Sequence, residues 1–246
     1  FRTDGEYLDS RHPSDVQFVS DLRSDMLRRD FTINALAYND QSGIIDCVGG
    51  VRDIENKIIR CVGDPEKRFR EDALRMMRAV RFSVVLGFEI EQNTAAAIKK
   101  CAILIKKISA ERIREEIEKI LRSENPGGII KLHELGLLQY IIPELDICFS
   151  VPQKNKYHIY NVGEHIIHAT AESADDITIR WAALLHDIGK PLCKSVDQNG
   201  IIHFYGHHRE SVRLADDILH RLRLDNESRK NILLLIENHD IRIDPN

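Results

Sequence analysis

Charged side chains gather near residue 30, where their types and spacing suit chemistry with phosphate and hydroxyl groups. The run Arg28-Arg29-Asp30 is followed, four residues after the aspartate, by Asn34. Guanidinium groups bind phosphate oxygens through two-point, charge-assisted hydrogen bonds, and a carboxylate accepts hydrogen bonds from ribose hydroxyls. An aspartate that starts a helix, with solvated arginines before it, would give the same pattern. The residue types alone leave both interpretations open.

A second charged cluster lies further along the chain and comprises Asp72, Arg75, Arg78 and Arg81. On a helix, Asp72 and Arg75 would be neighbours, so that a carboxylate acceptor lies beside guanidinium donors. This pair suits the amino group and adjacent ring acceptor of cytosine or adenine, whereas uracil and guanine would place an acceptor against the carboxylate. Each three-residue step turns about 60° around a helix, which would put Arg81 roughly opposite Asp72. The alternative is an amphipathic helix with an internal Asp–Arg pair.

The segments 28–36 and 71–82 together resemble the nucleotide-handling motifs of the class II tRNA nucleotidyltransferase (CCA-adding enzyme) and bacterial poly(A) polymerase family. The resemblance implies tRNA, CTP and ATP as partners. It also implies that Asp72 and Arg75 pair with the base. The nucleotide-binding residues expected from both motifs are Arg28, Arg29, Asp30, Asn34, Asp72, Arg75, Arg78 and Arg81.

Further phrases extend the resemblance over nearly the whole chain, namely Asp4–Tyr7, Arg11–Pro13, Gly49-Gly50 and Glu111–Glu116. In this family a glycine-arginine loop and paired catalytic aspartates would precede Phe1. Those carboxylates hold the Mg²⁺ ions that activate the 3′ hydroxyl and stabilise the leaving pyrophosphate. We therefore expect the Mg²⁺ ligands to lie upstream, no catalytic residue for nucleotidyl transfer within the chain, and a truncated or incompletely ordered protein. The alternative is a protein that has lost the catalytic element and retains only binding.

Histidines are concentrated toward the end of the chain, where nine of the eleven follow residue 150. The phrase 184–191 and the spacing of His165, His186-Asp187 and Asp240 resemble the HD superfamily of metal-dependent phosphohydrolases. Imidazole and carboxylate ligands suit a divalent transition metal such as Mn, Co, Ni or Fe, or Mg with looser binding. The metal would activate water toward a phosphate ester, and Lys190 would neutralise the phosphate. His207 is a candidate extra ligand, although a histidine in such a place is more often structural.

Hydrophobic patterning and the resemblance predict a mostly α fold. Segments 16–19 and 43–48 suit strands with one helix between them, and helical spacing of apolar residues begins near Pro65. Breaks at 125–128 and 152–156 divide the helical remainder. We expect a partial α/β nucleotidyltransferase head followed by a helical neck and body and an all-α HD domain. The expected bounds are 1–60 for the head, 61–125 for the neck, 126–152 for the body and 153–246 for the HD domain.

The composition argues against a membrane protein and a disulfide-bonded protein, and it indicates a local excess of positive charge. No apolar stretch reaches the roughly 18 residues of a membrane span, so no membrane partner is expected. Five cysteines form no CxxC pair, which favours reduced thiols and a cytoplasmic location. The net charge is −4, yet residues 57–122 hold 16 Lys and Arg against 10 Asp and Glu. That local excess would attract phosphate-rich RNA, and Lys99–Arg122 is the predicted part of such a surface.

The resemblance to the family implies a tRNA nucleotidyltransferase that adds CCA to tRNA 3′ ends from CTP and ATP. A poly(A) polymerase shares the same motifs and would use ATP alone. A metal-dependent HD phosphohydrolase, acting on a nucleic-acid 3′ phosphate or cyclic phosphate, is a further alternative. In that case the preceding helices would serve as an RNA-binding platform. A non-catalytic RNA-binding module is another possible function. The sequence gives no indication of the oligomeric state.

Overall fold

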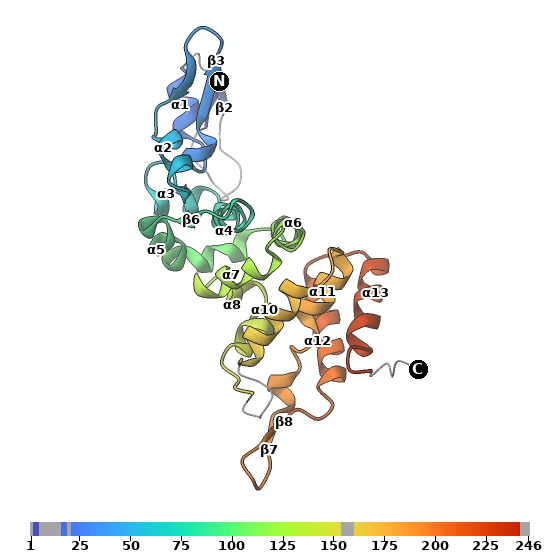
Figure 1. Ribbon diagram of the computed structural model, residues 1–246. Coiled ribbons are helices and arrows are strands. Elements are labelled where there is room, and N and C mark those ends of the chain that lie inside the picture. The colour runs from blue at the N-terminus through green and yellow to red at the C-terminus, as the bar shows by residue number, and fades with distance from the viewer. Residues whose placement is uncertain (1, 5–15, 19–20, 154–159, 242–246) are drawn as a thin grey trace. The chain divides into compact units, whose positions relative to one another are not determined.

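The computed structural model describes residues 2–4, 16–18, 21–153 and 160–241 (Figure 1). Contacts within the chain divide it into two compact units, residues 1–109 with 135–137 and residues 110–134 with 138–246. Helices form most of the described residues, and the strands form four two-stranded sheets there, which confirms the mostly α fold class. The expected bounds of head, neck, body and HD domain stay a prediction. Residues 5–7, 11–13, 19 and 154–156, which belong to segments named in the sequence analysis, lie outside the described residues.

The first unit begins with short strands and helices. Strand β1 (Arg2–Asp4) pairs antiparallel with β2 (Val16–Phe18), and β3 (Leu36–Asn39) pairs antiparallel with β4 (Gly43–Asp46). Between β2 and β3 lie helix α1 (Leu22–Leu27) and the 3₁₀ turn η1 (Thr32–Asn34). This order matches the strands that the sequence predicts near residues 16–19 and 43–48, with one α-helix between them.

A Gly-Gly turn starts the next helix, α2 (Gly50–Glu55), against the 3₁₀ turn η1. The Asp46 carboxylate accepts hydrogen bonds from the four backbone N–H groups of residues 48 to 51 at 2.8 to 3.0 Å. Gly49 has a left-handed φ of 80°, and a Cβ on Gly50 would lie 2.2 Å from the Thr32 carbonyl oxygen. The two glycines therefore allow α2 to pack directly on the segment that carries Asn34.

Helices α3 (Pro65–Glu71), α4 (Leu74–Leu86) and α5 (Gln92–Cys101) form the helical part of the first unit. The 3₁₀ helix η2 (Ala102–Lys107) follows α5, and strands β5 (Ile58–Ile59) and β6 (Glu89–Ile90) form a parallel pair. The core of this part consists of fully buried apolar side chains, among them Phe69, Met76, Met77, Val80 and Ile98.

Asp72 interrupts the helix on which the sequence analysis placed it. The residue is extended, with φ −145° and ψ 106°, and it separates α3 from α4. Its Oδ1 accepts a hydrogen bond from the Leu74 backbone N–H at 3.0 Å, which satisfies a donor at the start of α4. The expectation that Asp72 and Arg75 share one continuous helix is therefore wrong, because the aspartate starts the second helix instead of continuing the first.

The second unit begins with helix α6 (Ala110–Leu121) and contains several short helical elements and four further helices that pack together. The four further helices are α10 (Val162–Glu172), α11 (Ile177–Leu185), α12 (His207–Arg221) and α13 (Asn226–Glu237). The short elements are η3 (Pro126–Ile129), α7 (Ile130–Glu134), α8 (Leu138–Ile141), α9 (Pro143–Cys148) and, between α11 and α12, η4 (Lys190–Cys193). A hairpin of β7 (Ser195–Val196) and β8 (Ile202–His203) precedes α12 (Figure 1). Among the described residues, no helix combines the length and apolar character needed to cross a bilayer.

Polar side chains cap the start of α10, α11 and α13, whereas Gly206 precedes α12 without a side-chain cap. Asn161 and Glu164 form a reciprocal capping box at α10, and Asp176 and Asp225 cap α11 and α13. Helix α11 packs against α10 and α13, and α13 also packs against α12. The buried side chains between them include Trp181, which is 1% exposed. Caps and core together fix the ends of the helices, where the residues described below are located.

Gly189 provides a test of how closely α12 packs on the segment before it. A Cβ at this position would lie 2.5 Å from the His207 carbonyl oxygen and 2.5 Å from the Ser211 backbone nitrogen. We expect Gly189→Ala to lower the free energy of unfolding by about 2 kcal/mol, because α12 must move to make room. Urea unfolding followed by the fluorescence of Trp181, the single tryptophan, measures this change.

The comparison variant is Gly200→Ala, where φ is 77° and nothing lies within 4 Å of an added Cβ. Backbone strain alone should cost about 1 kcal/mol there. Equal losses in the two variants would mean that the approach of α12 to Gly189 is not the reason for a glycine at that position.

Candidate nucleotide-binding motifs and metal centre

The two adjacent arginines of the first motif are both held by Asp25, which is 4% exposed. Arg28 Nη2 lies 2.5 Å from one carboxylate oxygen of Asp25, and Arg29 Nη2 lies 3.2 Å from the other. Arg29 Nη1 also donates to the Asn34 carbonyl oxygen at 2.8 Å. The sequence analysis missed Asp25, although its spacing of three and four residues from the arginines was a usable signal.

Asp30 connects the two motifs. Its Oδ1 accepts hydrogen bonds from the Phe31 N–H at 2.9 Å and the Asn34 side-chain amide at 3.2 Å. Its Oδ2 lies 2.6 Å from Arg78 Nη2, which comes from α4. Three of the predicted residues, Asp30, Asn34 and Arg78, are thus brought together from positions almost fifty residues apart in the sequence.

Arg75 is buried, and its guanidinium is clamped from two sides. Nη1 lies 2.8 Å from Glu71 Oε2, and Nη2 donates to the Arg28 carbonyl oxygen at 3.3 Å. Glu71 also pairs with Arg68 at 2.7 Å. Burial alone would raise the pKa of Glu71, but the hydrogen bonds from the two arginines hold that pKa below its ordinary value. A charged Glu71, which the sequence analysis did not single out, therefore fixes the direction of Arg75.

The remaining arginines of the second motif pack against the aromatic ring of Phe82. The guanidinium carbon of Arg81 lies 4.0 Å from the ring centroid, and that of Arg78 lies 5.4 Å from it. Phe82 in turn meets Phe31 edge to face, with centroids 5.9 Å apart. Cation–π contacts therefore place Arg78 and Arg81 beside one ring next to the first motif.

Asp187 lies at the centre of a second cluster, in the other compact unit, and is 1% exposed. Its Oδ2 lies 3.2 Å from His165 Nε2 and 3.1 Å from His186 Nε2. Its Oδ1 lies 3.1 Å from His207 Nε2 and 3.7 Å from His239 Nε2. The imidazoles come from α10, the end of α11, the start of α12 and the segment after α13. The predicted ligands His165, His186, Asp187 and His207 are thus brought together, and His239 joins them.

The orientation of three imidazoles is fixed by their second ring nitrogens. His186, His207 and His239 each present Nδ1 to the carbonyl oxygen of the residue three positions earlier, at 2.7, 2.9 and 2.7 Å. A carbonyl oxygen only accepts hydrogen bonds, so Nδ1 must carry the proton in each case. The lone pairs of the three Nε2 atoms consequently point toward Asp187, which is the arrangement that metal-ligating histidines need.

The cluster has the unsatisfied atoms that a metal centre would satisfy. Asp187 Oδ1 is buried without a hydrogen-bond partner among the described residues. Nε2 of His165 lies 3.3 Å from that of His186, and Nε2 of His207 lies 3.4 Å from that of His239. Neutral nitrogens that face each other so closely repel unless a proton or a cation lies between them. Two groups of three ligands share Asp187, so the residues would hold up to two divalent ions, one in each group.

Electrostatics favour a charged carboxylate at the centre. Burial disfavours the ionised form of Asp187, but its close contacts with the surrounding imidazoles hold its pKa well below the ordinary value. The predicted ligand Asp240 has a side chain that is 60% exposed and lies 3.5 Å from His207 Nε2 and 3.4 Å from His239 Nε2. It therefore adjoins the second group of three ligands.

Lys190, the predicted phosphate-neutralising residue, is 9% exposed and lies against the same carboxylate. Its Nζ is 2.6 Å from Asp187 Oδ2 and donates to Gln153 Oε1 at 3.0 Å. The structure thus places Lys190 at the edge of the cluster, and its role toward a phosphate stays a prediction.

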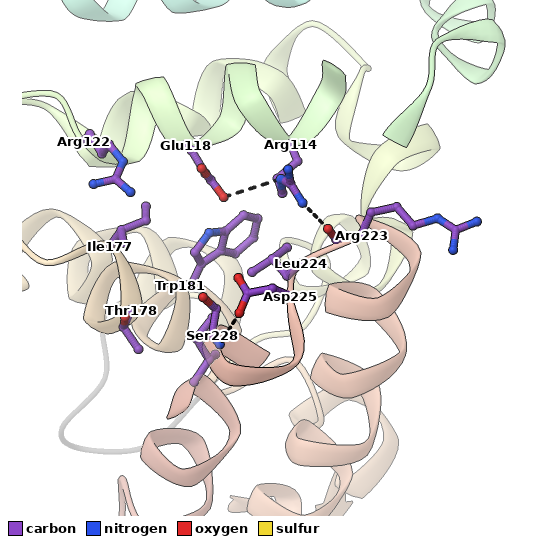
Figure 2. Close-up of a pocket in the computed structure, with 11 residues that line it drawn as sticks. Arg114, Glu118, Arg122, Ile177, Thr178, Trp181, Arg223, Leu224, Asp225 and Ser228 are labelled. Carbon is purple, nitrogen blue, oxygen red and sulfur yellow. Dashed lines mark hydrogen bonds and ion pairs between the residues drawn. The ribbon is translucent and has the colours of Figure 1, made fainter. Parts of the chain in front are cut away.

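A cavity of about 460 Å³ lies elsewhere in the second unit (Figure 2). Arg114 and Glu118 of α6 form an ion pair at 3.7 Å along its wall, and the Trp181 indole lies below them. The Trp181 Nε1 atom is buried and has no hydrogen-bond partner among the described residues. Its lining includes Arg114, Glu118 and Arg122 of the predicted RNA surface, but none of the predicted nucleotide-binding or metal-binding residues.

Models of known protein families match three successive segments of the chain. Three family models match: "Poly A polymerase head domain" at residues 1–60, "Probable RNA and SrmB-binding site of polymerase A" at 87–148 and "HD domain" at 156–246. A CCA-adding enzyme of Streptococcus sanguinis is 53% identical over 220 residues, which cover 89% of this chain and 51% of that protein. The chain belongs to the CCA-adding enzyme and poly(A) polymerase family. The resemblance of the two sequence motifs is thereby confirmed.

Other members of the CCA-adding enzyme and poly(A) polymerase family give the same result. A CCA-adding enzyme of Lactobacillus helveticus is 58% identical over 120 residues, or 49% of this chain and 30% of that protein. The crystal structure of the Bacillus stearothermophilus CCA-adding enzyme in complex with CTP superposes with a TM-score of 0.63 at 32% identity, covering 98% of this chain and 51% of that one. The chain thus spans about half the length, or less, of the relatives it matches. Both the CCA-adding enzymes and the HD domains are metal-dependent families.

Metal stoichiometry tests the geometry of the Asp187 cluster. We expect the protein to bind two divalent ions per chain, one for each group of three ligands, in Mn²⁺ or Co²⁺ titrations quantified by elemental analysis. Asp187→Asn should abolish both sites, because the carboxylate belongs to both groups. His239→Ala should remove one ion and leave the other.

His208→Ala is the matched control, because His208 adjoins His207 in the sequence but belongs to neither group of ligands. It should retain both ions. A wild-type protein that binds a single ion, or a His239→Ala variant with unchanged stoichiometry, would contradict the shared-carboxylate arrangement.

Proposed function

We propose that this protein is a tRNA nucleotidyltransferase that adds CCA to tRNA 3′ ends from CTP and ATP. The observation that carries the proposal is the 53% identity to the CCA-adding enzyme of Streptococcus sanguinis over 89% of the chain. The structural neighbour from Bacillus stearothermophilus is a complex with CTP, and a Thermotoga maritima neighbour is complexed with tRNA. The match of residues 87–148 to an RNA-binding family model supports Lys99–Arg122 as part of the RNA surface.

We assign the base-reading role to Asp72 and Arg75, and the binding of the nucleotide to the arginines around them. The clamp on Arg75 by Glu71 supports this assignment, because a guanidinium of fixed direction discriminates hydrogen-bond patterns better than a mobile one. Arg29, Arg78 and Arg81 supply positive charge beside the same motifs, where a triphosphate would gain from charge-assisted hydrogen bonds. Arg28, Asp30 and Asn34 hold this arrangement together through the contacts described above.

Mg²⁺ is the proposed metal of nucleotidyl transfer. Among the described residues, every group of three or more candidate metal ligands belongs to the Asp187 cluster. The residues named above are proposed to bind and orient the nucleotide, and the magnesium ligands stay assigned to the segment upstream.

Nucleotide selectivity tests the proposed transfer function. We expect CTP and ATP to bind at least about tenfold more tightly than UTP and GTP in equilibrium titrations, because uracil and guanine would place a carbonyl oxygen against the carboxylate where cytosine and adenine place an amino group. Glu71→Gln should weaken CTP binding about tenfold, since Arg75 loses a charge-assisted hydrogen bond.

Glu66→Gln is the control, since Glu66 lies on the same helix and pairs with Arg70 and Lys100 at the surface. It should bind CTP as the wild type does. Equal affinity for all four nucleotides would refute the base-reading assignment. In the full-length gene product, extension of a tRNA that lacks CCA with ATP alone would instead identify a poly(A) polymerase.

The Asp187 cluster supports a second function, a metal-dependent phosphohydrolase acting on a nucleic-acid 3′ phosphate or cyclic phosphate. Four imidazoles and a buried carboxylate would hold the ions, which would supply an activated water when bound. Lys190 lies beside the carboxylate, where its ammonium would offset charge on a phosphate. The second function requires no change in the first, because the two clusters belong to different compact units.

Hydrolysis of a 2′,3′-cyclic nucleotide measures this second function. We expect activity with Mn²⁺, Co²⁺ or Ni²⁺ that a chelator removes and that Asp187→Asn reduces to background, since both groups of ligands lose their shared member. Asp175→Asn serves as control, because that carboxylate is 81% exposed and belongs to neither group. Absence of hydrolysis in wild-type protein with confirmed metal occupancy would refute the phosphohydrolase.

We also propose a cytoplasmic location. The support is chemical: all five cysteines are free, and burial raises the pKa of Cys61 and Cys148 to about 12. Such thiols are unreactive core residues, as expected of a protein that functions without disulfides.

A further inference from the structure

We propose that His203 and Tyr205 form a base-stacking platform for the substrate of the Asp187 centre. The proposal rests on the phosphohydrolase function and narrows its substrate class. A nucleobase next to the scissile phosphate would lie on the open face of the Tyr205 ring, so a nucleoside phosphate or an RNA 3′ end is preferred over a phosphate ester without a base.

The two rings already form a stack at the end of the β7–β8 hairpin. Their centroids lie 5.1 Å apart and their planes differ by 10°. Tyr205 is 76% exposed, so the stack leaves most of its surface open to solvent. An exposed aromatic face with a second ring behind it is the feature by which proteins bind unpaired bases, at about 1 to 3 kcal/mol per base.

The lower ring of the stack is held in place by the hairpin. His203 Nε2 lies 3.1 Å from Asp197 Oδ2, and Ser195 pairs with His203 in the antiparallel register. Asp197 Oδ1 itself accepts hydrogen bonds from the backbone N–H groups of Asn199 and Ile201 at 2.9 Å each. The imidazole is thus fixed before any ligand arrives, which reduces the entropy lost when a base stacks on its neighbour.

The platform is connected to the metal-binding cluster by a single residue. Phe204 follows His203, and its carbonyl oxygen accepts the Nδ1–H of His207 at 2.9 Å. The Phe204 ring centroid lies 5.6 Å from Lys190 Nζ, which in turn contacts Asp187 at 2.6 Å. Tyr205 is two residues from His207, so their Cα atoms lie within about 7 Å of each other. A phosphate at the cluster and its own base at Tyr205 are therefore within the reach of one nucleotide.

The neighbouring side chains distinguish a base from an apolar partner. Val196 and Ile201 are exposed on the same hairpin, at 60% and 41%, and a protein partner could use them. The stacked pair, however, carries a phenol, whose polar edge can stay in water while its face stacks, and an imidazole whose Nε2 contacts Asp197. Their position directly before a candidate metal ligand favours a ligand that also carries a phosphate.

Substrate preference is the test. With the metal-loaded protein, kcat/KM is measured for a 2′,3′-cyclic nucleotide and for glycerol phosphate, which has the phosphate but no base. We expect Tyr205→Ala to lower the ratio of the two values about tenfold, mainly through KM for the nucleotide, in line with the loss of one stacked base. Tyr205→Phe should restore the ratio, because the ring face is retained.

Tyr38→Ala is the matched control, since Tyr38 is 72% exposed and belongs to the other compact unit. It should leave the ratio at the wild-type value. An unchanged ratio in Tyr205→Ala, with hydrolysis of both esters intact, would overturn the platform while the phosphohydrolase stands. A wild-type dimer that Tyr205→Ala converts to monomer, with the ratio unchanged, would assign the hairpin to a protein contact.

If neither ester is hydrolysed, the phosphohydrolase has failed and the platform is tested by binding alone. Calorimetric titration of the Mn²⁺-loaded protein with a nucleoside 3′-phosphate should give about tenfold weaker binding for Tyr205→Ala than for wild type or Tyr205→Phe. Equal affinities in the three proteins would overturn the proposal.

Discussion

The carboxylate of Asp187 is the interaction on which the second unit depends. It is almost fully buried, so its charge has lost most of its hydration and must be compensated by neighbouring groups. Four imidazoles and the Lys190 ammonium surround it; His186 and Lys190 belong to its own segment, whereas His165, His207 and His239 come from three other parts of the unit. Burying an uncompensated carboxylate costs several kcal/mol, so the helices that carry these partners must pack in register. Fold and candidate chemistry therefore share one constraint.

The first unit uses buried and partly buried acids in the same way but for a different purpose. Asp25, Asp30 and Glu71 each hold one or two arginines by charge-assisted hydrogen bonds. A guanidinium held by an acid keeps one direction and still has donors left over, because it carries five N–H groups. The acids thus turn flexible side chains into a surface of fixed positive charge, which is what selective binding of a nucleotide requires.

The sequence predicted residue types well and three-dimensional partners poorly. Motif residues such as Asp30 and Arg78 were recognisable, but nothing in the sequence indicated that they form an ion pair, since their contact depends on how α4 packs. Asp72 was placed on a continuous helix because apolar spacing continues across it, whereas a local hydrogen bond to the next helix start ends α3 there. His239 was missed because it adjoins Asp240, the residue that the HD resemblance implies, and only the end of α13 decides which of the two faces Asp187.

Helix ends explain why the imidazoles of the cluster are so well oriented. The last carbonyl oxygens of a helix have no partner within the helix. His186 directly follows α11 and His239 lies just beyond α13, and each presents Nδ1 to a carbonyl oxygen of the preceding helix's last turns. A hydrogen bond that the helix terminus needs is therefore the same bond that directs Nε2 inward. Because backbone geometry supplies these acceptors, any side chain three residues earlier would serve, and no sequence motif marks them. The length of each helix, set by its caps and core, is thus what aims the ligands at Asp187.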